Sequence, residues 1–383
     1  MSARIVQFGT SRFLQAHVDL FVHEAREDGQ DAGPITVVKT TRSTERAGRV
    51  AAFAAGYPVI VRGIEDGHAV ERRLMVTSVD AGLSAVDDWE ALVAVFVGQA
   101  GFVVSNTGDS GYTIDPADRH LSLFGAAGAP QSFPAILLKL LWLRWRDGGA
   151  PFTILPCELI HRNGTALRGI ITGLAREVGA TAAFVDWLGA CIWADTLVDR
   201  IVSAPIEPIG AVAEPYALWA IGAQPGLVLP WTHPAVVMTD DLEPYERLKL
   251  HILNLGHTVL AQSWLDDGAR EGMTVRAMMA GEAGARMEAL LRTEVVPGFA
   301  AKALGEQADA YLATTLDRFR NPHLDHLLCD IAQHHAQKIE RRIEAFFAWT
   351  GNVTPQLAAI VERNRVSSDQ DGTDRVTPAT LRA

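Results

Sequence analysis

Three residues capable of proton transfer and hydrogen bonding recur at helical spacing past the middle of the chain. Lys249, Asn254 and His257 lie in the segment YERLKLHILNLGHT, whose apolar residues also recur at helical intervals. On an α-helix, Lys249 and Asn254 would be separated by about 140° and Asn254 and His257 by about 60°, so all three can line one broad face. A desolvated lysine can exchange a proton with an alcohol or ketone oxygen, while an amide and an imidazole can hold substrate oxygens. The alternative is a solvated lysine, a capping asparagine and a half-buried histidine.

Further candidates lie where strand-like and helical segments meet. Asn163 follows a strand-like run and precedes a helical one. Its ordinary role there is to cap the helix, and the alternative is a hydrogen bond to a substrate oxygen. Arg318, His326 and Lys338 lie in a later stretch rich in arginine and histidine. That stretch contains no HxxxH or HExxH spacing, so we predict no metal site and consider Arg318 and Lys338 for binding an anion such as an acidic sugar.

A dinucleotide-binding loop is predicted at the start of the chain. The segment GTSRF follows the first strand-like run and opens a helix, which is where a pyrophosphate binds to backbone N–H groups. Ser11 occupies the second glycine of the usual GxGxxG pattern. No acid follows the second strand to hold the ribose of NAD, whereas Arg42 could accept the 2′-phosphate of NADP, so this choice stays open. The candidate cofactor-binding residues are Gly9, Thr10, Ser11, Arg12, Phe13, Thr41, Arg42, Asn106 and Thr107.

The elements that must position these residues alternate between strand and helix in the first part of the chain. β-branched runs are typical of buried parallel strands, and apolar residues at helical spacing lie between them. This alternation predicts a Rossmann-like, doubly wound α/β domain over residues 1–242. Strands are expected at 5–8, 35–38, 57–62, 72–79, 102–104 and 152–155, and helices at 13–26, 91–97, 135–146 and 165–178.

Helical periodicity dominates the rest of the chain, so a mostly α-helical substrate-binding and catalytic domain is expected over residues 243–383. We expect the polar stretch from residue 364 to form a tail or a surface strap.

Composition narrows the class of protein. The 383 residues are 48% hydrophobic and 21% charged, as in globular proteins with two or three domains. A formal net charge of −11 argues against nucleic acids and anionic membranes as partners. Three widely spaced cysteines and the absence of a leader-like or membrane-spanning segment predict a reduced, cytoplasmic protein.

Taken together, these segments resemble the polyol-specific long-chain dehydrogenases, which include mannitol dehydrogenase, fructuronate reductase and tagaturonate reductase. The family pattern KxxxxNxxH matches Lys249, Asn254 and His257, and Glu246 occupies the acidic position before it. Asp199 lies in the VDRI signature. The segments CELI and RFRNP, with His326 and Lys338, are most similar to the tagaturonate and fructuronate reductases, and Asp330 stands where the mannitol enzymes have an arginine that binds a hydroxyl group.

The resemblance implies metal-independent hydride transfer with NAD, while NADP is left open. It assigns Lys249 as the general acid in ketone reduction and the general base in alcohol oxidation. It also implies an oxyanion hole of Asn163 and Asn254, substrate binding by His257, and proton exchange with solvent through Glu246. Further substrate-binding candidates are Asp199, Arg318, His326 and Lys338. The expected reaction is reduction of a keto-sugar acid, and the alternatives are a neutral polyol 2-dehydrogenase and a non-catalytic dinucleotide sensor.

Overall fold

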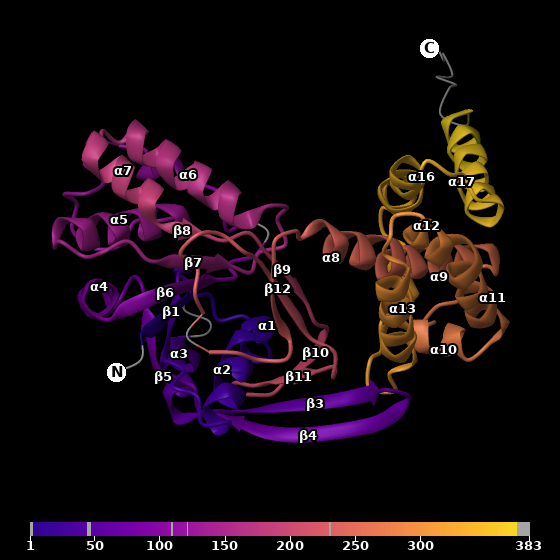
Figure 1. The fold of residues 1–383 in the computed structure, drawn as a ribbon, viewed down its shortest axis with the longest axis horizontal. Coiled ribbons are helices and arrows are strands. Elements are labelled where there is room, and N and C mark those ends of the chain that lie inside the picture. Colours follow the sequence, from indigo (N-terminus) through magenta and orange to yellow (C-terminus); the bar gives the residue numbers. More distant parts are fainter. Residues whose placement is uncertain (1–2, 44–46, 109, 121, 230, 374–383) are drawn as a thin grey trace, which may run out of the picture. The chain divides into compact units, whose positions relative to one another are not determined.

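The computed structural model describes residues 3–43, 47–108, 110–120, 122–229 and 231–373. The chain forms two compact units (Figure 1). Unit 1 contains the residues up to Arg62 together with Val70–Leu242, and unit 2 contains Gly63–Ala69 and the residues from Glu243 onward.

A six-stranded parallel sheet forms the centre of unit 1. Its strand order is β5-β2-β1-β6-β7-β8, and every pairing is parallel. The order reverses between β1 and β6, which makes the carboxyl ends of these two strands the topological switch point where ligands bind in such sheets. The predicted Rossmann-like domain is confirmed. The strands are β1 (Arg4–Phe8), β2 (Ile35–Lys39), β5 (Val79–Ser84), β6 (Ala100–Ser105), β7 (Thr153–Pro156) and β8 (Ile192–Trp193).

The helix predicted over residues 13–26 is interrupted. It forms α1 (Arg12–Gln15) and α2 (Val18–Glu27), with non-helical backbone angles at His17. The imidazole of His17 is buried, and its Nε2 lies 3.1 Å from the carbonyl oxygen of Leu218. The other helices of unit 1 are α3 (Ala47–Ala52), α4 (Trp89–Gly98), α5 (Phe133–Arg146), α6 (Asn163–Glu177) and α7 (Ala182–Ala190).

Two smaller sheets complete unit 1. One has the order β10-β11-β3-β4 and the other β13-β12-β9. The predicted pair of strands over 57–62 and 72–79 is present as neighbouring strands β3 and β4, with residue 79 opening β5. Strands β9 to β13 were not predicted, because runs of three to five residues carry little periodicity. The bounds are β3 (Tyr57–Glu65), β4 (His68–Val76), β9 (Thr196–Asp199), β10 (Val202–Pro205), β11 (Ala211–Ala213), β12 (Leu218–Gly222) and β13 (Val236–Thr239).

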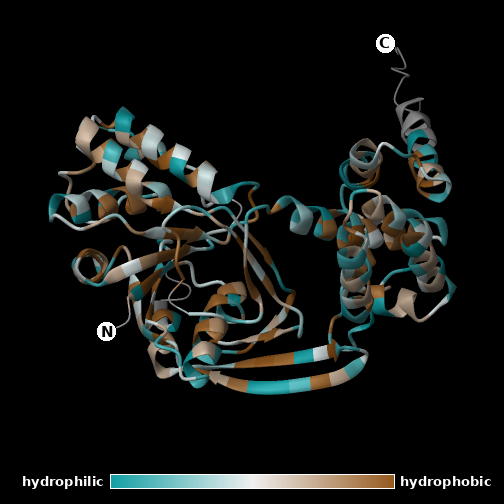
Figure 2. Ribbon diagram, viewed as in Figure 1, coloured by the Kyte–Doolittle hydropathy of each residue, from teal (hydrophilic) through white to brown (hydrophobic). Residues whose placement is uncertain are grey.

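Unit 2 is helical, as predicted, and its apolar faces share one core. Figure 2 shows hydrophobic and hydrophilic residues interleaved along these helices, as expected for helices with one buried face. In the part of unit 2 that the structure describes, three π-helices interrupt the α-helices. The elements are α8 (Glu243–Leu248), η3 (π, Lys249–Asn254), α9 (Leu255–Asp266), α10 (Val275–Met279), α11 (Glu282–Leu290), η4 (π, Leu291–Val295), α12 (Val296–Ala300), α13 (Gly305–Arg320), α14 (Leu328–Ile331), α15 (His335–Ile339), η5 (π, Glu340–Glu344), α16 (Ala345–Thr350) and α17 (Pro355–Thr373).

The polar stretch that we expected to form a tail or a surface strap from residue 364 begins as helix and remains helical as far as residue 373. Helix α17 starts at Pro355 and is anchored by the buried side chains of Leu357, Ile360 and Val361, so its backbone continues as helix into the polar stretch. Residues 374–383 lie outside the described part of the chain. Within that part, none of the helices has the length and apolar character needed to cross a membrane.

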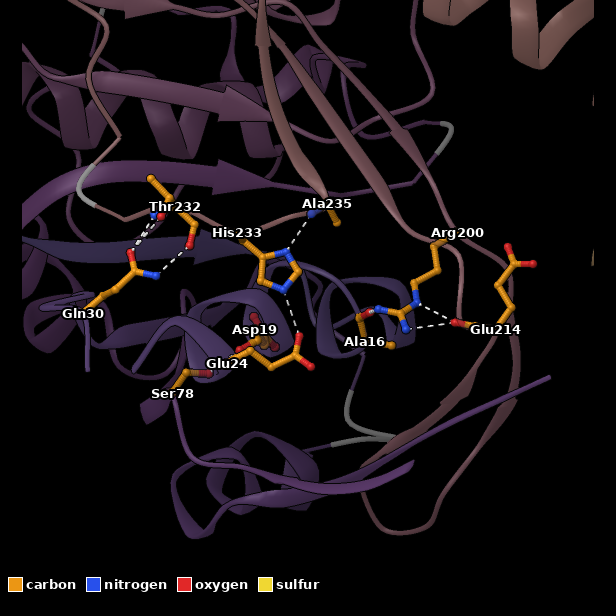
Figure 3. Close-up of polar contacts among 10 residues, drawn as sticks. All are labelled: Ala16, Asp19, Glu24, Gln30, Ser78, Arg200, Glu214, Thr232, His233 and Ala235. Carbon is orange, nitrogen blue, oxygen red and sulfur yellow. Dashed lines mark hydrogen bonds and ion pairs between the residues drawn. The ribbon is translucent and has the colours of Figure 1, made fainter. Parts of the chain in front are cut away.

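Helix α2 carries a fully buried carboxyl group, that of Asp19. Asp19 of α2 accepts a hydrogen bond from the Tyr57 hydroxyl at 2.6 Å, and Ser78 donates to the Asp19 backbone carbonyl at 2.6 Å (Figure 3 draws Asp19 and Ser78). Burial raises the pKa of Asp19 from 3.8 to about 7, although hydrogen bonds from Tyr57 and Gln7 act in the opposite direction.

This raised pKa predicts a pH-dependent stability. The folded protein holds the Asp19 proton more tightly than the unfolded chain, so the stability contributed by Asp19 is complete below pH 3.8 and is lost as the pH rises to about 7. Relative to Asp19→Asn, the free energy of unfolding of the wild-type protein should therefore fall from about pH 5 to about pH 7 and then level off. Urea unfolding of both proteins across this range measures the difference, and a difference independent of pH would contradict the assignment.

Candidate active site

The loop after β1 packs directly against the loop after β6. Gly9 has a φ of 118°, and a Cβ atom at this position would lie 2.3 Å from the carbonyl oxygen of Asn106. Ser11 caps α1 by accepting a hydrogen bond from the Leu14 backbone N–H at 3.2 Å. Its hydroxyl donates to Asn106 Oδ1 at 3.0 Å. Glycine is therefore required at position 9, and Ser11 joins the two loops.

A cavity of about 460 Å³ lies at the carboxyl ends of β1, β2 and β6. The residues predicted to bind the cofactor are mostly among those that line it. Phe13 and Arg42 are not: the Phe13 ring stacks on His17 at 4.6 Å, and Arg42 Nη2 donates to the Ala129 carbonyl at 3.4 Å. The lining residues are Gly9, Thr10, Ser11, Arg12, Lys39, Thr40, Thr41, Arg49, Asn106, Thr107, Gly108, Pro205 and Glu207.

Glu158 holds the loop after β6 to the loop after β7. Its buried carboxylate accepts hydrogen bonds from the Ser105 hydroxyl at 2.9 Å, from the Thr107 backbone N–H and hydroxyl at 3.0 Å each, and from the Tyr112 hydroxyl at 3.2 Å. Burial raises the pKa of Glu158, and the hydrogen bonds from Ser105 and Thr107 oppose that shift. The carboxylate therefore fixes Thr107 at the wall of the cavity.

Asn163 is fully buried, and both the nitrogen and the oxygen of its side-chain amide are hydrogen-bonded. Its Nδ2 donates to the carbonyl oxygens of Pro156, Glu158 and Thr196 at 3.0–3.1 Å. Its Oδ1 accepts from the backbone N–H groups of Gly164 and Thr196 at 2.9 and 2.8 Å. Arg162, in the left-handed region, caps α6, so Asn163 is its first residue and not the cap. The predicted contact with a substrate oxygen would require one of these bonds to be exchanged.

Asp199 is the last residue of β9 and is almost fully buried. It lies near His17, whose pKa is lowered to about 3 by burial and raised only weakly by the Asp199 charge. The neighbouring Arg200 donates to the Ala16 carbonyl at 2.7 Å and to the Glu214 carbonyl at 3.1 and 2.9 Å (Figure 3). These bonds fix the backbone that carries Asp199.

In unit 2 the segment with the predicted catalytic residues is a π-helix. Helix η3 spans Lys249–Asn254 and hydrogen-bonds residue i with residue i+5, so residues five apart lie about one turn apart on the same face. The separation of about 140° expected for an α-helix does not apply to Lys249 and Asn254. Both side chains are half-buried. Glu246 precedes them in α8, and His257 follows in α9.

His257 packs against the segment that carries His326. The His257 ring lies 4.4 Å from the Phe319 ring and 5.0 Å from the His326 ring, centroid to centroid. Burial lowers the pKa of His326, Asp330 raises it, and Lys338 lowers it further. Arg318 is also buried, and its Nη1 lies 3.4 Å from the Tyr311 hydroxyl. Among the residues that the structure describes, no group of three or more His, Cys, Asp or Glu side chains could hold a metal ion.

Arg342 joins two of the π-helices. From η5, its Nη1 donates to the Asn254 carbonyl and to Thr258 Oγ1, each at 3.0 Å. In return, His251 of η3 hydrogen-bonds to the Arg342 carbonyl at 3.0 Å through Nδ1. The bonds run in both directions, so η3 and η5 hold each other in register.

Lys338 lies close enough to Arg342 for the two positive charges to interact. Its Nζ donates to the Ile331 carbonyl at 2.7 Å. Burial lowers the pKa of Lys338, and the nearby Arg342 lowers it further. The pKa of His335 is lowered by burial and by the charges of Lys338 and Arg342. A bound anion would relieve this mutual repulsion.

Comparison with known families now places the chain. Residues 3–227 match the mannitol dehydrogenase Rossmann domain, and residues 241–348 match the mannitol dehydrogenase C-terminal domain. The chain belongs to the mannitol dehydrogenase family. Membership of this family makes it a dehydrogenase with an N-terminal Rossmann domain and a helical C-terminal domain, as the resemblance implied.

Relatives and solved structures agree with this placement. The altronate oxidoreductase of Bacillus subtilis (strain 168) is 29% identical over 367 residues, which is 88% of this chain and 73% of that protein. The altronate oxidoreductase of Klebsiella pneumoniae (strain 342) is 31% identical over 368 residues, 89% of this chain and 74% of the relative. A ternary complex of Pseudomonas fluorescens mannitol 2-dehydrogenase with NAD and D-mannitol has the same fold, with a TM-score of 0.71, 21% identity and coverage of 94% of this chain and 78% of that one.

Four residues that shape the candidate site were not among the site residues predicted from the sequence. Lys39 and Arg49 line the cavity, Glu158 fixes its wall, and Arg342 holds η3. Lys39 directly follows the strand predicted over residues 35–38, which is a usable signal for a residue at a switch point. Arg342 follows Lys338 by four residues in a helical segment, but its partners in η3 lie more than 80 residues earlier.

Arg342 provides a test of the connection between the π-helices. Arg342→Met removes two hydrogen bonds from a charged donor, so the free energy of unfolding should fall by about 1–3 kcal/mol. Arg341→Met, at an exposed neighbouring position, should change it by less than about 0.5 kcal/mol. Urea unfolding of the three proteins gives these values, and equal losses in the two variants would contradict the assignment.

Proposed function

We propose that this protein is an NAD(P)H-dependent reductase of a keto-hexuronate of the tagaturonate or fructuronate type, which oxidises the corresponding hydroxy acid in the reverse direction. The observation that carries the proposal is the position of Lys338 and Arg342. Arg342 is hydrogen-bonded to the turn that bears Asn254, and the charge of Lys338 acts on His326, the ring partner of His257. Lys338 and Arg342 are both partly desolvated and lie beside predicted substrate-binding residues. A carboxylate on the substrate would pair with these two positive charges, which explains why they are placed there. The names of the altronate oxidoreductases at 29–31% identity support the same substrate class.

Residues of unit 1 fit a nicotinamide dinucleotide. The cavity lies at the switch point of the parallel sheet, and residues 9–12 line it. Arg12, Lys39 and Arg49 supply positive charge, while Asn106 and Thr107 form the opposite wall. When bound, the cofactor supplies the hydride.

The residues of unit 2 supply the proton and the oxyanion contacts. We assign Lys249 Nζ as the donor of a proton to the ketone oxygen and as its acceptor in the reverse reaction. Asn254, on the same face of the π-helix, donates a hydrogen bond to that oxygen as negative charge develops. His257 binds a substrate hydroxyl group, and Glu246 exchanges the proton of Lys249 with solvent. Arg318 and His326 remain candidate substrate ligands beside Lys338, as Asn163 and Asp199 do in unit 1.

A neutral polyol 2-dehydrogenase is the competing function, and substrate choice separates the two. Oxidation of NADH and NADPH is followed with tagaturonate, fructuronate, fructose and fructose phosphate. We expect turnover with a uronate and little with fructose. Turnover with fructose alone would establish the neutral polyol activity, and binding of cofactor without turnover of any substrate would contradict the reductase.

The role of Lys249 has its own test. Lys249→Met removes the proton donor, so kcat should fall by about 10²- to 10⁴-fold while cofactor binding is retained. Lys302→Met removes an exposed lysine of the same unit and should leave kcat unchanged. Steady-state kinetics with the preferred uronate measures both variants, and full turnover by Lys249→Met would overturn the assignment.

A further inference from the structure

Two cations lie at the carboxyl end of β2. Lys39 is the last residue of that strand, and Arg49 lies in α3. Both line the cavity of about 460 Å³ and also a second cavity of about 310 Å³. The two cavities adjoin, because they share four lining residues, Thr10, Lys39, Thr41 and Arg49.

Both cations are held in place by backbone carbonyl groups. Lys39 is only 8% exposed, and its Nζ donates to the Thr41 carbonyl at 2.7 Å. Arg49 donates through Nε to the Pro208 carbonyl at 2.7 Å, so its Nη groups are not needed for that bond. The positive charges are therefore fixed at the cavity wall, where a ligand meets them without first ordering two flexible side chains.

The position of these cations corresponds to the place where the adenosine ribose of a dinucleotide binds in a Rossmann fold. In a Rossmann fold, the ribose of the adenosine half lies at the end of the second strand. An acid at this point accepts hydrogen bonds from the 2′-hydroxyl group of NAD, whereas a cation accommodates the 2′-phosphate of NADP. Here the strand ends in Lys39 and continues as TTRS, and the acid among the described residues lining these cavities is Glu207, which lies beyond β10.

We propose that the ribose subsite of unit 1 binds a 2′-phosphate through Lys39 and Arg49, so that the protein prefers NADP(H) to NAD(H). The inference rests on the proposed dinucleotide-dependent function and specifies its cofactor. Thr41 and Ser43, which line the second cavity, can add hydroxyl hydrogen bonds to the phosphate oxygens. Arg42, the cation that the sequence suggested for this role, is exposed and bonds to the Ala129 carbonyl instead.

Direct binding tests this inference without turnover. Isothermal titration of the full-length protein with NADPH, NADH, 2′,5′-ADP and 5′-AMP compares ligands that differ by the 2′-phosphate. NADPH should bind at least about tenfold more tightly than NADH, and 2′,5′-ADP more tightly than 5′-AMP, because a charge-assisted phosphate contact is gained. Equal or tighter binding of NADH would overturn the inference while leaving the dehydrogenase proposal intact. Binding of none of these ligands would overturn both.

Single substitutions test whether Lys39 and Arg49 cause the preference for NADPH over NADH. Arg49→Gln should weaken NADPH binding by about tenfold and leave NADH binding nearly unchanged, because only the phosphate contact is lost. Lys39→Met should act in the same direction, and circular dichroism checks that this buried substitution leaves the fold intact. Arg42→Gln is the matched control and should alter neither affinity. Selective loss of NADPH binding in Arg42→Gln, with none in Arg49→Gln, would overturn the assignment of the subsite.

Discussion

The crevice of unit 1 depends on how closely the backbone at Gly9 passes the carbonyl group of Asn106. Any side chain at position 9 would occupy the space of that oxygen, and the φ of 118° also disfavours other residues. Because β1 and β6 are neighbours at the point where the strand order reverses, their loops must share this narrow space. Ser11 and Asn106 then bond side chain to side chain, and Asn106 Nδ2 donates to the Cys157 carbonyl at 2.7 Å. Asn106 thus links the loops after β1, β6 and β7, and the carboxylate of Glu158 ties the last two of these loops together.

Unit 2 contains a π-helix, whose backbone conformation is less stable than that of an α-helix, and it must therefore be held by other contacts. Helix η3 brings Lys249 and Asn254 closer together on one face than the separation of about 140° in an α-helix would. Arg342 stabilises the end of that segment through the Asn254 carbonyl, and the imidazole of His251 returns the contact to η5. The cost of the irregular helix is offset by hydrogen bonds from outside the segment. The same arginine contributes positive charge near the predicted substrate-binding residues.

The sequence predicts the parallel sheet well, because its strands are buried on both faces and appear as continuous β-branched runs. It does not predict strands β9 to β13, which are too short to show periodicity, and the pairing of β11 with β3 joins segments about 150 residues apart. It also cannot show that η3 is a π-helix, since Lys249, Asn254 and His257 fit an α-helical pattern and the hydrogen-bond partner of η3, Arg342, lies more than 80 residues further along the chain. The burial of the Asn163 amide arises in the same way, from the backbone of Thr196 in another element. For the cofactor, the sequence indicates a cation after β2 but not which cation lines the cavity, because Arg49 reaches it from a helix ten residues further on.

The central claim is that a hydride from the cofactor adds to the carbonyl carbon of a keto-hexuronate while a lysine of the chain supplies the proton. Reduced nicotinamide cofactor carrying two deuterium atoms at C4 of the ring tests this directly, with the product of tagaturonate or fructuronate reduction analysed by NMR. The account predicts one deuterium on the new carbinol carbon of each product molecule, in a single configuration. A carbinol carbon that carries hydrogen from solvent, or no reduction of either uronate by a protein that binds the cofactor, would contradict it.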